Sequence, residues 1–443
     1  MRIAVWSPLP PTPSGVADYV AEQLGPLGRH FAVQAVVGDP SSVDPGPLRG
    51  VEVVAPAGAE ADLHLYHLGN SPAHAYAYRA ARERPGVAFL HEWSLHNLVL
   101  HETVARGDVA SYLREMRRAH GERGTFVARQ VARGLGGELF PSMLPLNDRA
   151  LASSLAVVTL TQEAGEKARG RVPGRPVLAL PMHFASPLDP LPSAQEARRH
   201  LGLPGDALIV TAPGLGTAAK RLDLVVRAVG RLRGRDPRIR LVVAGELEPG
   251  SGVEDAARAA GLGEGLVVTG RLGLGDFVRH IAAADVVAAL RFPSHGEMSA
   301  ALVRALGLGR PALVTAGTPA GLEFPEGVVV PVTPGPTEED ELLALLARLL
   351  GDAPLRARIG ALAREHVLAH HDLGRTVDLL ADFLRAVDAR KEELRSTLDV
   401  DADEGSLQAF FQEEVRWAAR DLGLSGYRLG SEGVAFDLGG GRR

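Results

Sequence analysis

Cysteine is absent from the 443-residue sequence, so disulfide bonds and thiolate metal sites are excluded and a reducing compartment is favoured. Long apolar runs are absent too: no stretch reaches the roughly 18 uninterrupted apolar residues of a membrane-spanning helix. The first residues, MRIAVWSPLP, contain only a four-residue apolar run before Ser7, which is too short for a signal-peptide core. We therefore expect a cytoplasmic protein without a membrane span.

Lysine is scarce and occurs only at positions 167, 220 and 391, which makes each lysine a candidate for a specific role. A net charge of −5 and a pI near 6.3 argue against a globally basic nucleic-acid binder, so we expect no nucleic-acid partner. With 46% hydrophobic and 23% charged residues, the chain is long enough for two domains and polar enough to be soluble.

Short apolar runs alternate with amphipathic segments along both halves of the chain. In the first half, strands are predicted near residues 2–6, 32–37, 51–54, 63–66, 87–90, 156–160 and 177–180. In the second half, strands are predicted near residues 207–211, 241–244, 266–269, 286–290, 312–315 and 328–330. This alternation is typical of parallel sheets with helices on both faces, so we expect an α/β fold.

The proline-rich segment 181–206 is interpreted as a linker between two domains, 1–185 and 186–373. A further helix is expected at 374–397. Residues 398–443 form an extension with an acidic run, an amphipathic helix at 407–422 and a glycine-rich end that we expect to be mobile. Its run DVDADEG has Glu404 at the sixth position of a calcium loop, where glycine is required, and the twelfth position is Phe410, where glutamate is required, so we expect no metal there.

The stretch RFPSHGEMSAALVRALGLGRP, residues 291–311, joins a predicted strand to a helix through a loop rich in proline, glycine and serine. In a parallel sheet such a loop lies at the carboxyl edge, where α/β folds bind ligands. The free backbone N–H groups and the positive end of the helix dipole at that point favour a phosphate. The stretch therefore predicts a phosphate-binding helix N-terminus.

Three segments resemble retaining glycosyltransferases of family 4: SPLPPTPSGVADYV, the loop ending at Lys220, and GEMSAALVRALGLGRP. Residues 66–96 also resemble the acceptor side of these enzymes, where a histidine follows a strand. The resemblance reaches to about residue 396 and implies the GT-B fold, with two Rossmann-like doubly wound domains facing a cleft. The N-terminal domain would bind the acceptor, the C-terminal domain would bind the nucleotide sugar, and the helix at 374–397 would cross back to the first domain.

The resemblance implies a set of functional residues. Three would be catalytic: His91 facing the donor sugar, Glu297 bonded to sugar hydroxyls, and Lys220 holding the diphosphate. The residues implied for donor binding are Gly15, Gly216, Arg221, Gly270, Arg271, Arg291, Gly296, Met298 and Ser299. Those implied on the acceptor side are Asn70 and His96. The sequence departs from the family at Arg304, where an acid usually binds ribose, and that puts the nucleotide identity in doubt.

Such a transfer must stabilise a departing nucleoside diphosphate, chiefly by electrostatics. We expect retention at the anomeric carbon, a nucleotide-sugar donor, no metal ion and no other cofactor. The acceptor would be a glycan, a lipid-linked molecule or a small molecule. The arginine-rich segment 108–134 is interpreted as a solvated helical pair that would give weak peripheral membrane contact if the acceptor is a lipid.

Other interpretations stay open. Arg304 and the extension are compatible with a non-catalytic nucleotide-binding or scaffold protein on the same fold. GLGTAA at 214–219 reads as a dinucleotide fingerprint with Glu246 after the next strand, which would suit an NAD-dependent oxidoreductase. A zinc site at His91, His96 and His101 is disfavoured, because offsets of five residues do not share one helical face.

Overall fold

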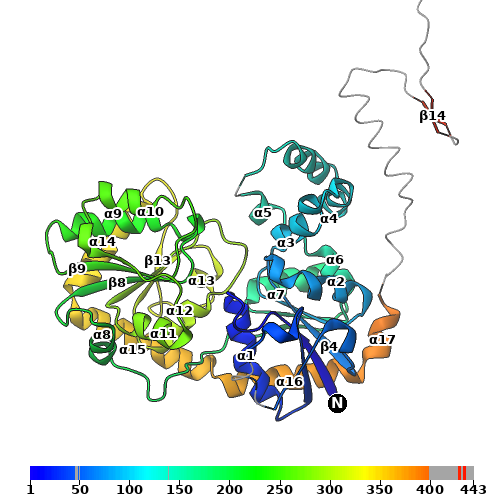
Figure 1. Ribbon diagram of the computed structural model, residues 1–443, viewed down its shortest axis with the longest axis horizontal. Helices are drawn as coiled ribbons and strands as arrows, with labels where there is room; N and C mark the ends of the chain where they lie inside the picture. Colours follow the sequence, from blue (N-terminus) through cyan, green and yellow to red (C-terminus); the bar gives the residue numbers. More distant parts are fainter. Residues whose placement is uncertain (45–47, 49, 138, 399–427, 431–432, 436–443) are drawn as a thin grey trace, which may run out of the picture.

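The computed structural model describes residues 1–44, 48, 50–137, 139–398, 428–430 and 433–435 (Figure 1). Two α/β domains lie side by side, one formed by the N-terminal part of the chain and one by the following part. The amphipathic helix predicted at 407–422, the acidic run and the glycine-rich end lie outside the described residues. Two short antiparallel strands, β14 (Arg428–Gly430) and β15 (Gly433–Ala435), are described within the extension.

The N-terminal domain is built on a seven-stranded parallel sheet with the order β3-β2-β1-β4-β5-β6-β7. Its strands are β1 (Arg2–Trp6), β2 (Ala32–Val36), β3 (Glu52–Val54), β4 (Leu63–Leu68), β5 (Val87–Leu90), β6 (Ala156–Thr159) and β7 (Val177–Ala179). Successive side chains of a strand point to opposite faces, and in β1 both faces are apolar. Ile3 and Val5 pack into one core, whereas Ala4 and Trp6 pack into another. The sheet therefore needs helices on both faces.

One face of this sheet is covered by α1 (Gly15–Leu27) and by the later helix α16 (Leu373–Ala389). The other face is covered by α2 (Ala75–Glu83), α3 (His96–Glu102), α4 (Val109–Ala132), α6 (Asp148–Ala152) and α7 (Gln162–Arg171). Helices α3 to α6 lie between β5 and β6, and α4 with the short α5 (Phe140–Met143) forms a projection at the top of the domain (Figure 1).

The C-terminal domain has a six-stranded parallel sheet with the order β10-β9-β8-β11-β12-β13. Its strands are β8 (Leu208–Pro213), β9 (Ile239–Ala244), β10 (Leu266–Val268), β11 (Val286–Ala289), β12 (Ala312–Thr315) and β13 (Val330–Val332). Helices on one face are α9 (Leu222–Arg233), α10 (Val253–Ala259) and α14 (Glu338–Gly351). Helices on the other are α8 (Ala194–Leu201), α11 (Leu274–Ala282), α12 (Ala300–Gly307) and α15 (Ala353–His370). The short α13 (Pro319–Leu322) follows β12.

These two doubly wound parallel-sheet domains confirm the α/β fold class expected from the alternating pattern. The predicted strand at 328–330 lies two residues later, because a turn from Pro325 O to Val328 N occupies its first position. The predicted single helix at 374–397 is divided at Arg390 into α16 and α17 (Lys391–Ser396).

Helix α16 returns from the C-terminal domain to pack against α1. Its Val377 and Leu380 share a core with Leu24 of α1, and His30 Nε2 lies 2.9 Å from Asp378 Oδ1. The same apolar core continues to α11 and α12, so α1 contacts the C-terminal domain as well. Ser94 N, after β5, donates to His295 O, after β11, at 3.0 Å, so the carboxyl ends of these strands in both sheets face a common boundary between the domains.

Candidate active site

The loop between β11 and α12, which we call the donor loop (residues 290–299), is held by its own side chains. Gly296 has a φ of 83° and donates its N–H to Ser294 Oγ at 3.1 Å. Glu297 Oε2 accepts hydrogen bonds from His295 N at 2.7 Å and from Ser294 Oγ at 3.1 Å. Glu297 Oε1 lies 2.8 Å from Arg291 Nε. The loop therefore fixes one carboxylate and one guanidinium at its centre.

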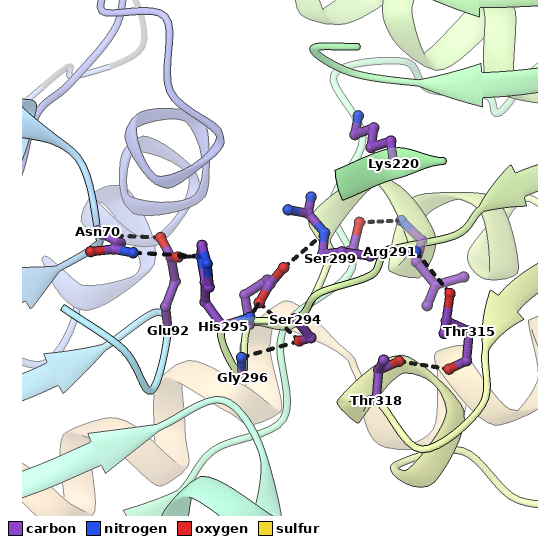
Figure 2. Close-up of polar contacts among 12 residues, drawn as sticks. Asn70, Glu92, Lys220, Arg291, Ser294, His295, Gly296, Ser299, Thr315 and Thr318 are labelled. Atoms are coloured by element: carbon purple, nitrogen blue, oxygen red, sulfur yellow. Dashed lines mark hydrogen bonds and ion pairs between the residues drawn. The ribbon is translucent and has the colours of Figure 1, made fainter. Parts of the chain in front are cut away.

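Two further contacts join the donor loop to neighbouring loops of the same sheet edge. Arg291 N donates to Thr315 Oγ1 at 2.9 Å, and Thr318 Oγ1 donates to Thr315 O at 2.7 Å (Figure 2). Phe292 N donates to Ala219 O at 2.7 Å, which ties the donor loop to the loop after β8. Three loops at the carboxyl edge of the sheet are thus packed as one unit.

Lys220 lies at the end of a short 3-10 helix after β8, and its Nζ donates to Pro213 O. Gly214 leaves room for this amine, because a Cβ at that position would lie 2.8 Å from Lys220 Nζ. Burial lowers the pKa of Lys220 to about 7, and the positive charge of Arg291 acts in the same direction. An anion beside the two cations would favour the protonated amine.

Lys220, Arg291, Glu297, Ser299 and Thr318 line one small cavity of about 30 Å³. Such a cavity holds about one water molecule, so a diphosphate requires the lining to move. Ser299 is the N-cap of α12, since its Oγ accepts from Leu302 N at 3.3 Å, and the positive end of that helix opens at the cavity. Met298 is buried in the core, so only its backbone is available to a ligand. The cavity has the charge and the dipole of an anion site.

On the opposite domain, His91 follows β5 and is almost completely buried. Its Nε2 is 2.9 Å from His67 Nδ1, and its ring stacks on Phe89 with centroids 4.9 Å apart. Burial is the main cause that lowers the pKa of His91 well below its ordinary value, and the neighbouring His67 acts in the same direction. His91 is therefore a neutral imidazole, with Nε2 engaged in the protein and Nδ1 without a hydrogen-bond partner among the described residues.

The donor loop also contacts the acceptor-side loops directly (Figure 2). His295 Nδ1 lies 3.7 Å from Glu92 Oε2 and 3.5 Å from Asn70 Nδ2. His295 O accepts from Ser94 N at 3.0 Å, and a Cβ on Gly296 would lie 2.6 Å from the Cβ of Trp93. The neighbouring carboxylate of Glu92 is the main cause that raises the pKa of His295 above its ordinary value. The donor and acceptor sides are therefore in contact in this structure.

Asn70 acts within the acceptor side as a cap. Its Oδ1 accepts from Asn97 N at 2.8 Å and from Leu98 N at 3.2 Å, which satisfies the first turn of α3. Its own N–H donates to Glu92 Oε1 at 3.0 Å. Asn70 therefore fixes the position of Glu92 relative to α3.

The other predicted residues are placed differently. His96 lies inside the N-terminal domain, where Nε2 contacts Tyr112 OH at 2.8 Å and Nδ1 contacts Leu144 O at 2.6 Å. Arg221 pairs with the buried Glu338 at 2.7 Å rather than with the cavity. Gly216 is buried against Leu247, and its N–H donates to Glu246 O at 2.7 Å. The structure does not bring these three residues to the cavity.

Three predicted residues lie at the domain boundary instead. Arg271 Nη2, in the C-terminal domain, donates to Pro11 O at 2.6 Å. Pro11 belongs to the proline-rich loop before α1, in the N-terminal domain. Gly270, beside it, has a φ of 68°, and a Cβ at that position would meet no atom within 4 Å. Gly15 is the first residue of α1 and is exposed at the same edge. The proline-rich loop therefore meets the C-terminal domain.

Arg304, the departure noted in the sequence, makes a buried ion pair between domains. Its Nη2 lies 2.6 Å from Glu22 Oε1 of α1, and Glu22 Oε2 lies 2.9 Å from His183 Nε2. The side chains are 6%, 16% and 0% exposed for Arg304, Glu22 and His183. Burial alone would raise the pKa of Glu22, but His183 and Arg304 hold it below its ordinary value. Arg304 thus joins α12 to α1.

Several contributors were not identified from the sequence. His295 could have been noticed, because it is a titratable residue two positions before Glu297. Glu22 and His183 carry no sequence signal, since Arg304 and His183 lie 282 and 161 residues from Glu22 along the chain. Within the described part of the chain, no three His, Asp or Glu side chains cluster as metal ligands would, and no helix is long and apolar enough to cross a membrane.

The amino-acid sequence is similar to known proteins over part of its length. Residues 193–366 match the family model of glycosyl transferases, group 1. A D-inositol 3-phosphate glycosyltransferase of Stackebrandtia nassauensis is 30% identical over 211 residues, 44% of this chain and 45% of that protein. The same enzyme of Actinosynnema mirum is 32% identical over 213 residues, 45% of this chain and 49% of that protein. The chain thus spans about half the length of the curated relatives it matches.

Solved structures extend the similarity to nearly the whole fold. HepE of Anabaena, in complex with UDP and glucose, has a TM-score of 0.59 at 15% identity and covers 87% of this chain and 100% of its own. Sucrose-phosphate synthase of Thermosynechococcus elongatus has a TM-score of 0.59 at 18% identity, covering 88% and 99%. The chain therefore has the GT-B fold, and its residues 193–366 match the group 1 family of glycosyl transferases.

Proposed function

We propose that this chain transfers a sugar from a nucleoside-diphosphate sugar to an acceptor hydroxyl, with retention at the anomeric carbon. The observation that carries the proposal is the cavity where Lys220, Arg291 and the N-terminus of α12 converge. Two cations and a helix dipole suit the charge that grows on a departing diphosphate. The UDP and UDP-glucose bound by the structurally similar HepE support a ligand of this class.

In the proposed reaction, the bond from the anomeric carbon to the β-phosphate oxygen breaks and leaves its electron pair on that oxygen. The acceptor oxygen bonds to the same face of the sugar, and its proton passes to the leaving phosphate oxygen. Lys220 and Arg291 stabilise the phosphate, which makes a metal ion unnecessary. Glu297 and the neutral His91 orient sugar hydroxyls from opposite domains.

Donor binding requires a rearrangement of the donor loop, and the contacts of Glu297 indicate what must change. In this structure Glu297 is bound by Arg291, His295 N and Ser294 Oγ. A diphosphate competes for Arg291, and this competition would release one carboxylate oxygen toward the sugar. Binding of the phosphate and alignment of the sugar are therefore coupled through one guanidinium.

The non-catalytic alternative rests on Arg304, which occupies the position of the expected ribose acid and is already paired with Glu22. The oxidoreductase alternative is weakened by the loop at 214–219, because Gly216 N and O are both bonded within the protein, to Glu246 O and Glu248 N. A dinucleotide fingerprint needs such N–H groups free for a pyrophosphate.

Product analysis tests the proposal. The chain is incubated with UDP-, GDP- and ADP-sugars and candidate acceptors, and the anomeric configuration of any glycoside is read by NMR. Transfer with retention supports the proposal. Nucleoside-diphosphate binding without turnover of any donor, including hydrolysis, would favour the scaffold function, and inverted product would reject the stereochemistry.

A further inference from the structure

Helix α4 folds into a hairpin that projects from the N-terminal domain (Figure 1). Gly121 interrupts the helix with φ 60° and ψ −144°, a conformation that residues with a side chain rarely adopt. Gly124 permits the close return of the chain, because a Cβ there would lie 2.1 Å from Met116 O. The second half of α4 thus folds back toward the first half.

Large apolar side chains are exposed on this projection. Phe126, Leu135, Leu139 and Met143 are 64%, 61%, 50% and 69% exposed. They all lie between residues 126 and 143, and they include the three most exposed large apolar side chains of the described residues. Single exposed apolar residues are ordinary, but a group on one projection marks a contact surface.

The charge around these side chains is positive. Residues 106–143 contain seven arginines and four acidic residues, an excess of three positive charges in a chain whose net charge is −5. Arg118, Arg123 and Arg133 are exposed, as are the acidic Asp108 and Glu122. Arg123 lies three residues before Phe126 on the second half of α4, and Arg133, the residue that caps the end of α4, lies seven residues after Phe126 along the same helical face.

The projection is fixed directly to the acceptor side of the cleft. Ser94 Oγ donates to Pro141 O of α5, and Asn147 Nδ2 donates to Trp93 O at 2.7 Å. His96 joins α3 to α4 through Tyr112 OH at 2.8 Å. The loop that carries His91 and Glu92 is therefore hydrogen-bonded directly to the projection.

We propose that Phe126, Leu135, Leu139 and Met143, with the arginines around them, form a docking surface for an anionic lipid membrane. Apolar side chains enter the interface between headgroups and acyl chains, and arginines pair with anionic headgroups. The net positive charge of residues 106–143 favours an anionic lipid surface over an apolar protein partner as the ligand of this surface. One consequence rests on the proposed function: docking places the acceptor side of the cleft beside lipid-anchored hydroxyls.

Vesicle flotation of the full chain tests the surface without any glycosyl transfer. Vesicles of phosphatidylglycerol and phosphatidylcholine in equal amounts are compared with pure phosphatidylcholine at low and high salt. We expect binding to the anionic vesicles only, weakened by salt. The double substitution Phe126→Ser and Met143→Ser should lower the affinity at least about tenfold, since it removes two inserted side chains.

The matched control is Leu322→Ser with Leu368→Ser, two leucines of the C-terminal domain that are 60% and 48% exposed. A charge reversal, Arg123→Glu, should weaken binding about three- to tenfold, whereas Arg199→Glu, an exposed arginine on α8, should not. Failure of the unmodified chain to bind anionic vesicles at low salt overturns the proposal. Equal binding of anionic vesicles by the projection variant and the control variant also overturns it. A third contrary result is that the unmodified chain self-associates without binding vesicles, and that the projection variant no longer self-associates.

Discussion

Arg304 of α12 and Glu22 of α1 form an ion pair of 2.6 Å between Nη2 and Oε1 across the domain boundary. Both side chains are largely shielded from water, and Glu22 is bonded on its other oxygen to His183. A position that the family resemblance assigns to ribose binding thus serves here to hold the two domains together. The contact between the two domains is therefore stabilised by buried, charged side chains from both of them.

Loss of this pair should destabilise the protein strongly. Arg304→Ala leaves a carboxylate buried without its cation, which costs about 3–5 kcal/mol of unfolding free energy. Chemical denaturation measures the change, and the control is Arg258→Ala, whose pair with Asp255 is exposed and contributes at most about 1 kcal/mol. Equal effects of the two substitutions would contradict a stabilising role for the buried pair.

Lys220→Ala should weaken binding of a nucleoside diphosphate about ten- to a hundredfold, because one charge-assisted contact is lost. Since the pKa of Lys220 is about 7 without ligand, affinity should fall as the pH rises above about 7. Lys220→Arg keeps its charge and should flatten that dependence. Calorimetric titration across pH measures both effects, and an unchanged pH profile in Lys220→Arg would argue against Lys220 as the titrating group.

The contact between His295 and Glu92 should depend on pH with a defined sign. The folded-state pKa of His295 is raised, so its contribution to stability is complete below about pH 6.5 and is lost as the pH rises through the folded value. His295→Gln should therefore be destabilising at about pH 6 and close to neutral near pH 9. Thermal unfolding at a series of pH values measures this difference.

His101→Gln provides the control for that experiment, because His101 lies 4.0 Å from Glu102 and is more exposed than His295. Its effect should be small at every pH. A His295→Gln difference that does not change with pH would show that the imidazole contributes by packing alone.

Gly296→Ala should disturb the contact between the domains more than Gly270→Ala. Both glycines have positive φ, so each substitution carries a backbone strain of about 1–2 kcal/mol. Only at Gly296 would the new Cβ also meet Trp93, at 2.6 Å. Small-angle scattering should show opening of the domains in Gly296→Ala alone, and the same profile in both variants would refute the importance of this contact.

The fold was predictable because its signal is local. Apolar runs such as residues 2–6 and 286–290 place strands, and the loops after them must lie at one edge of a parallel sheet. The same reasoning places the donor loop at that edge, whereas the roles expected for Glu297 and Lys220 came from the family resemblance. These residues lie near one cavity because β8 and β11 are neighbours in the sheet.

The contacts between the domains were not predictable from local patterns. Glu22 looks like an ordinary helix residue until α12 brings Arg304 to it, and His295 gains its role only from Glu92 on the other domain. His96 shows the converse case. It follows the same strand end as His91, but the projection behind it provides Tyr112 and Leu144 as partners, so it lies inside the domain.

A crystal structure of the chain with a bound nucleotide sugar tests the central claim most directly. We expect the diphosphate within hydrogen-bond distance of Lys220, of Arg291 and of the backbone N–H groups at the start of α12. We also expect the sugar between Glu297 and His91, with the pair of Arg304 and Glu22 intact. A diphosphate bound elsewhere, or a sugar beyond the reach of both Glu297 and His91 in the closed cleft, would contradict the proposed site.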